Sequence, residues 1–74
     1  MIVTIYLSTR QGSKPEFQCR REMDALPSVG SHLEISGHEA GEMLRIKVNA
    51  TSEKCPKLSA LVGDEGVWVI CQED

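Results

Sequence analysis

The side chains of this chain that could bind a metal ion or act as a soft nucleophile are Cys19, Cys55, Cys71, His32 and His38. Structural zinc sites usually place two such ligands within two to four residues of each other. No such pair occurs here, so the sequence predicts neither a metal site nor a cofactor. Lysines beside Cys55 could lower the pKa of its thiol. An ordinary exposed or half-buried cysteine is the simpler interpretation.

Catalysis by acids, bases or hydroxyl nucleophiles has no recognisable pattern either. No set of Ser, His and Asp and no pair of carboxylates stands out along the chain. With 74 residues there is room for one domain, spanning 1–74, in which nearly every apolar strand position is needed for the core. We therefore expect a non-catalytic protein. Small-molecule binding or catalysis at a cleft between subunits is the third alternative.

Charged residues alternate in blocks along the chain, and the net charge is −3. Residues 22–42 carry only acids, whereas basic residues lie before and after them. A mixed solvated surface is the usual result of such a pattern. If the strands at 17–23 and 43–48 both present their polar faces to solvent, however, Arg20, Arg45 and Lys47 could lie on one sheet surface and contact phosphates. A nucleic-acid-binding barrel is therefore the alternative function. Single-strand binding also needs aromatic platforms, and Phe17 is assigned to the core.

A group of apolar side chains favours association with another protein. Tyr6 and Trp68 lie opposite the best core residues of the first and last strands, alongside Ile2 and Ile70. First and last strands are neighbours in many small barrels, so these four side chains would form an exposed apolar patch. Such patches often mark interfaces. We predict that the patch serves self-association into a homo-oligomer or a protein partner, a prediction that fails if Trp68 is buried.

Short strands must position these side chains. Alternating apolar and polar residues predict strands at 2–8, 17–23, 32–36, 43–48 and 67–71. The first two strands, and the next two, are expected to pair as hairpins, with Arg21 interrupting the apolar face of the second strand. Residues 56–62 fit one or two helical turns or another strand. We favour the helix, which would begin near Pro56 and end before Gly63.

The turn before the third strand is the most distinctive local feature. Pro27 fixes its own φ, and Gly30 can take a positive φ that other residues resist. This segment resembles the diverging turn and second strand of SH3-like barrels through Leu26, Val29, Gly30, Leu33 and Ile35. The resemblance implies the barrel alone, because the aromatic and Pro-Asn-Tyr signature of peptide-binding SH3 domains is absent. The whole chain also resembles uncharacterised small barrel proteins of mobile gene cassettes and phages, which implies no particular activity.

Together, these patterns predict an all-β fold. We expect a small barrel of five or six mostly antiparallel strands, SH3-like in form, with a short helical turn near residues 56–62. An odd number of cysteines without close spacing indicates free thiols rather than a disulfide framework. No apolar run approaches the length of a membrane span. We therefore expect a soluble, cytoplasmic protein.

Overall fold

The computed structural model describes residues 1–8, 14–37 and 39–74. In these residues the chain forms five strands, β1 (Ile2–Leu7), β2 (Glu16–Glu22), β3 (His32–Ser36), β4 (Met43–Thr51) and β5 (Trp68–Glu73). A 3₁₀ helix, η1 (Pro56–Leu58), and a one-turn helix, α1 (Ser59–Val62), connect β4 to β5. The ambiguous segment is therefore helical. All predicted strands are present, although β5 begins at Trp68 instead of Val67 and β4 continues to Thr51.

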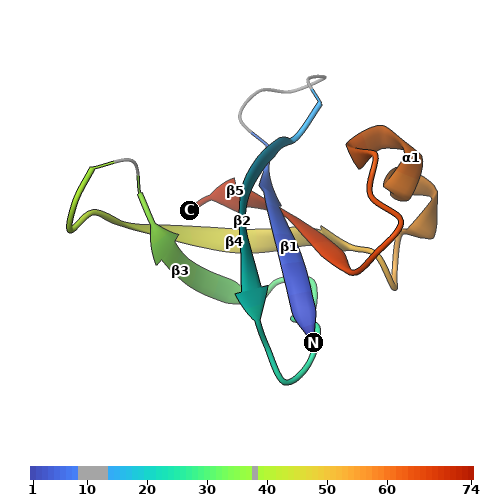
Figure 1. The fold of residues 1–74 in the computed structure, drawn as a ribbon, viewed down its shortest axis with the longest axis horizontal. Coiled ribbons are helices and arrows are strands. Elements are labelled where there is room, and N and C mark those ends of the chain that lie inside the picture. Colours follow the sequence, from blue (N-terminus) through green and yellow to red (C-terminus); the bar gives the residue numbers. More distant parts are fainter. Residues whose placement is uncertain (9–13, 38) are drawn as a thin grey trace.

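The five strands form one sheet in the order β2-β1-β5-β4-β3 (Figure 1). Both predicted hairpins, β1–β2 and β3–β4, are antiparallel, and β4 also pairs antiparallel with β5. The first and last strands are neighbours, as expected, but β1 and β5 run parallel and so join the two hairpins at the centre of the sheet. The prediction of a mostly antiparallel all-β fold is confirmed.

The sheet curls into a half-barrel whose concave face holds the larger core. Alternate residues of four strands fill it: Val3, Ile5, Leu7, Ile35, Ile46, Val48, Val69 and Cys71. This architecture is compatible with an SH3-like small barrel. Among the residues described, no helix is both long enough and apolar enough to cross a membrane.

A second, smaller core lies on the convex face, beneath η1 and α1. It contains Tyr6, Ala50, Val62, Trp68 and Ile70, and the partly buried Leu58 packs against it. Pro56 stands at the beginning of the helical segment, where its missing N–H is tolerated. Gly63 ends the segment with φ of 71°, and its N–H donates to the Ser59 carbonyl. The predicted helix limits are confirmed.

Phe17 is an exception to the predicted strand pattern. The expected place in the core is wrong, because the Phe17 side chain is 53% exposed. The β1–β2 register shifts between Ile5 and Tyr6, so that Cys19 opposes Ile5 but Phe17 opposes Tyr6. The extra residue, Gln18, forms a β-bulge that moves Phe17 to the convex face. There its ring meets the edge of Tyr6, with centroids 6.3 Å apart.

The turn before β3 has the predicted geometry at its glycine. Gly30 has a φ of 94°, and its N–H donates to the carbonyl of Val48 at 2.9 Å. The next residue, Ser31, donates to Ser28 and accepts from the N–H of Val48. These bonds fix the start of β3 against β4, and therefore the register of the edge strand.

Candidate functional site

The four residues predicted to form an apolar interface do not form an exposed patch. Trp68 is 0% exposed, and Tyr6 and Ile70 are buried as well. Only Ile2 remains at the surface, with 54% of it exposed. The physical reason is the helical segment, which covers the convex face of β1 and β5 with Leu58 and Val62. The interface predicted at Ile2, Tyr6, Trp68 and Ile70 is therefore wrong in this form.

Two hydrogen bonds fasten the helical segment to the sheet. The indole Nε1 of Trp68 donates to the hydroxyl of Ser59 at 3.0 Å. The phenol of Tyr6 donates to the carboxylate of Asp64 at 2.9 Å. Burial and this carboxylate raise the pKa of Tyr6 above its ordinary value. Both polar groups of the second core are thus satisfied, and the aromatic side chains are part of the fold itself.

The three basic residues of the nucleic-acid alternative are divided between two strands that are not neighbours. Arg45 and Lys47 are on β4, but Arg20 is on β2 with β1 and β5 in between. Three strand spacings of about 4.8 Å separate them across the sheet by roughly 14 Å. Arg20 lies over the Phe17 ring, at 5.3 Å from its centroid. The Arg45 Nε is 3.5 Å from the carboxylate of Asp74, so part of its charge is balanced.

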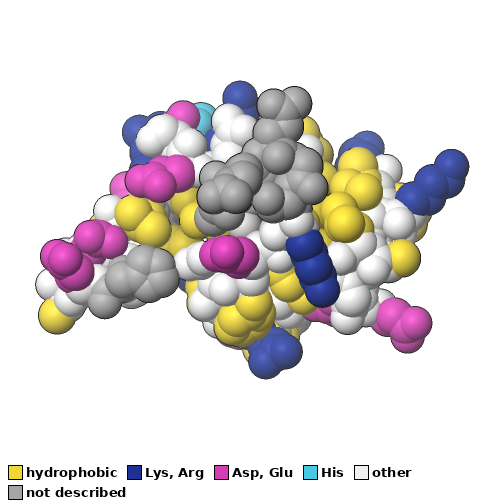
Figure 2. All heavy atoms as spheres, turned by 90° about the horizontal axis from the view of Figure 1, so that it is seen from above, with side chains coloured by type: hydrophobic (Ala, Val, Ile, Leu, Met, Phe, Trp, Pro, Cys, Tyr) yellow, Lys and Arg dark blue, Asp and Glu magenta, His cyan; other side chains and the backbone are white. Residues whose placement is uncertain are grey.

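Charged side chains of both signs are mixed on the face drawn in Figure 2, without a continuous basic area. His32 also contacts the Asp74 carboxylate, at 3.0 Å. His38 lies outside the described residues. Within the described ranges, no three side chains of the metal-binding types come together.

The three cysteines lie in different surroundings. Cys71 is buried in the concave core, where loss of water, and secondarily the nearby Cys19 thiol, raises its pKa to about 12. Cys55 is half-buried against the second core. Cys19 is half-buried too, and its side chain lines a groove between β2 and β3.

This groove follows from the order of the strands, because β2 and β3 are the two edges of the sheet. Directly after β2, Met23 donates from its N–H to the Met1 carbonyl at 2.8 Å, and its carbonyl accepts from the Met1 amine at 2.7 Å. Hydrogen-bonded pairs recur at every second residue of an antiparallel ladder. Arg21 and Cys19 therefore direct their main-chain groups to β1, whereas Arg20 and Glu22 direct theirs away from the sheet.

On β3, alternate residues likewise direct their main-chain N–H and C=O groups away from β4. Val48 donates to the Ser31 carbonyl, and Gly37 donates to the carbonyl of Glu42, so odd-numbered residues of β3 pair with β4. His32, Glu34 and Ser36 consequently direct their N–H and C=O groups outward. One of these outward groups has a partner, because the Arg21 Nη1 donates to the Glu34 carbonyl at 2.8 Å. Arg21 thus bridges the two edges.

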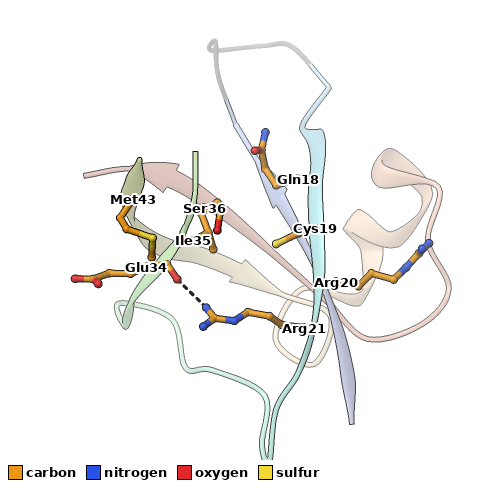
Figure 3. A pocket seen from close by; sticks show the side chains of 8 residues that line it. All are labelled: Gln18, Cys19, Arg20, Arg21, Glu34, Ile35, Ser36 and Met43. Atoms are coloured by element: carbon orange, nitrogen blue, oxygen red, sulfur yellow. Dashed lines mark hydrogen bonds between the residues drawn. The ribbon is translucent and has the colours of Figure 1, made fainter. Parts of the chain in front are cut away.

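Figure 3 shows the groove from close by, with the dashed line from Arg21 to the Glu34 carbonyl crossing it. Its volume is about 280 Å³. Cys19 and Ile35 line it on the core side, and the lining is completed by Gln18, Arg20, Arg21, Glu34, Ser36 and Met43. In the described part of the chain, no main-chain ladder joins β2 to β3. An open edge therefore stands on each side of a partly apolar floor.

A broader, open hollow of about 780 Å³ lies beside α1. Its lining includes two cations, Arg20 and Lys57, and two carboxylates, Asp64 and Glu65. The opposite charges offset each other, and Asp64 already accepts the hydrogen bond of Tyr6. The hollow consequently has no charge of one sign to recognise a ligand.

Sequence reasoning recognised Arg21 as a break in an apolar face, but not the groove that it crosses. The free edges arise only when β5 inserts between β1 and β4, which no local pattern reveals. Searches of protein-family models, curated proteins and solved structures found no match to this chain.

Proposed function

We propose that this protein is a non-catalytic interaction module that binds an extended segment of a partner protein. The segment adds as a strand to the free edge of β3, inside the groove between β3 and β2. Strand addition gives affinity through main-chain hydrogen bonds and specificity through alternate side chains. The observation that carries the proposal is the bond from Arg21 to the Glu34 carbonyl, since a side chain donates where an added strand would donate its N–H.

The geometry favours an isolated segment over a second copy of this chain. A strand in the groove has β3 on one side and β2 on the other, so both of its own edges must be free. In a second copy, β2 already pairs with β1, and β3 already pairs with β4. Neither edge strand of a second copy meets this requirement.

The size of the groove favours side chains of a peptide over a small molecule. At about 280 Å³ it falls just below the range of roughly 300–1,000 Å³ that is usual for small-molecule sites. Strand addition requires no such cavity, because most of the contacts are main-chain hydrogen bonds along an open edge.

The test uses proline at a free and at a paired position of the same strand. Glu34→Pro removes an outward N–H that β4 does not use, and edge strands tolerate proline at such positions. Linear peptides selected from a displayed random library on the wild-type protein are then measured by fluorescence anisotropy. We expect Glu34→Pro to weaken their binding at least tenfold while the far-UV circular dichroism stays unchanged. Ile35→Pro, at a paired position, should instead disrupt the fold.

Amide chemical shifts locate the binding site independently. Peptide addition should shift the amides of His32, Glu34 and Ser36 more than those of β5. Peptides that bind the proline variant and the wild-type protein equally well contradict the proposal. Peptides that change the amide chemical shifts of other surfaces contradict it too, as does failure to select any peptide. A dimer seen by light scattering that Glu34→Pro dissociates would make a second copy the occupant and overturn the choice of a partner segment.

A further inference from the structure

We infer that Arg21 makes this groove selective for segments that carry an acidic residue between two apolar ones, in the alternating order apolar, any, acidic, any, apolar. This inference rests on the proposed strand addition and names the chemistry of the bound segment.

A strand paired with β3 donates its own N–H to the Glu34 carbonyl and displaces the Arg21 guanidinium from it. In the free protein the Arg21 side chain is exposed, so water solvates its remaining donors. The added strand would exclude that water. Because arginine stays protonated, its charge would then need a partner of opposite sign.

The acids of this chain that lie nearby are not placed to supply that partner. Figure 3 shows the Glu34 carboxylate directed away from Arg21, which bonds to the main chain of Glu34 instead. The Glu22 carboxylate is 3.1 Å from the Met1 amine. The counter-charge must therefore come from the bound segment, and a carboxylate accepts both N–H groups of a guanidinium at once.

The residues beside Arg21 define the flanking positions. Side chains of an added strand alternate between the two faces of the sheet, so every second one enters the concave side. There it meets Cys19 and Ile35, which belong to the concave core or pack against it. Apolar side chains two residues before and after the acid fit this floor, while the residues between them remain in solvent.

The experiment uses a fluorescein-labelled peptide of sequence Thr-Val-Thr-Glu-Thr-Val-Thr and two versions with Gln or Lys at the centre. Wild-type protein should bind the Glu peptide at least about tenfold more tightly than the Gln peptide, since unpairing one member of a desolvated ion pair is strongly unfavourable. Arg21→Glu should reverse the preference and bind the Lys peptide best. Lys57→Glu is the matched control, because Lys57 is exposed in η1, outside the groove, and should leave the preference unchanged.

Equal binding of the Glu and Gln peptides, lost in Glu34→Pro, overturns the selectivity and leaves strand addition standing. A change of preference in Lys57→Glu as large as that in Arg21→Glu assigns the effect to general charge and also overturns the inference. Binding of none of the three peptides to the wild-type protein counts against the inference and against strand addition together. Circular dichroism and Trp68 fluorescence establish that each variant is folded.

Discussion

Removal of the Ser59 hydroxyl should destabilise the protein through a single side chain, Trp68. In the native structure Trp68 is 0% exposed, and its Nε1 donates to the Ser59 hydroxyl at 3.0 Å. Ser59→Ala leaves that donor buried without an acceptor, which costs about 1–3 kcal/mol. The higher helix propensity of alanine offsets this loss by only a few tenths of a kcal/mol. We expect a net loss of about 1–2.5 kcal/mol in the free energy of unfolding.

This loss is large on the scale of the whole chain. For 74 residues, stability of roughly 0.05–0.15 kcal/mol per residue amounts to about 4–11 kcal/mol. Each kcal/mol lowers the midpoint of thermal unfolding by about 4–8 °C in a domain of this size. Urea unfolding followed by fluorescence measures the change directly, because Trp68 is the only tryptophan.

Ser28→Ala is the matched control, since Ser28 is exposed and lies outside the second core. The control should stay within about 0.5 kcal/mol of the wild-type protein. The emission of Trp68 should also move to longer wavelength in Ser59→Ala, as water reaches the indole. An unchanged emission maximum together with a loss no larger than that of the control would refute the role given to this hydrogen bond.

Two further predictions concern pH and the end of α1. Because burial raises the pKa of Cys71 to about 12, its stabilising contribution is complete below about pH 9 and is lost between about pH 9 and 12, by up to about 1.4 kcal/mol per pH unit. Urea unfolding at pH 7–11 should show that the free energy of unfolding falls less steeply with rising pH in Cys71→Ala than in the wild-type protein. An equally steep fall in both proteins would contradict this prediction. Gly63 has a φ of 71°, so Gly63→Ala should lower stability by about 1–2 kcal/mol, and Gly63→Asn by less, in thermal unfolding. Equal midpoints for both variants and the wild-type protein would exclude this strain.

Local patterns were sufficient for most of the secondary structure. The alternation of residues 43–48 and the apolar residues of β1 predicted strands that the structure contains, and Gly30 has the expected positive φ. Helix 56–62 was also recognisable from Pro56 and Gly63, which stand at its two ends. These features depend on residues that are close in sequence, so short-range rules suffice.

The failures came from longer-range causes. A single bulged residue, Gln18, inverted the face on which Phe17 lies, and alternation alone does not reveal a bulge. Trp68 was expected at the surface because nothing in its own strand indicates that α1 folds back over it. The groove beside Arg21 depends on which strands become edges, and this is a property of the complete sheet.

The parallel pairing of β1 with β5 also affects how the chain folds during its synthesis. β1 is made early and β5 is made last of the strands, yet they are adjacent at the centre of the sheet. Until β5 leaves the ribosome, the two hairpins have no strand to join them, and Trp68 has not reached either core. Contacts between residues so distant in sequence slow folding. Until β5 is available, the apolar faces of the two hairpins therefore remain exposed to solvent. Stalled chains that end before residue 68 should accordingly be sensitive to protease, whereas chains with β5 outside the ribosome should become resistant.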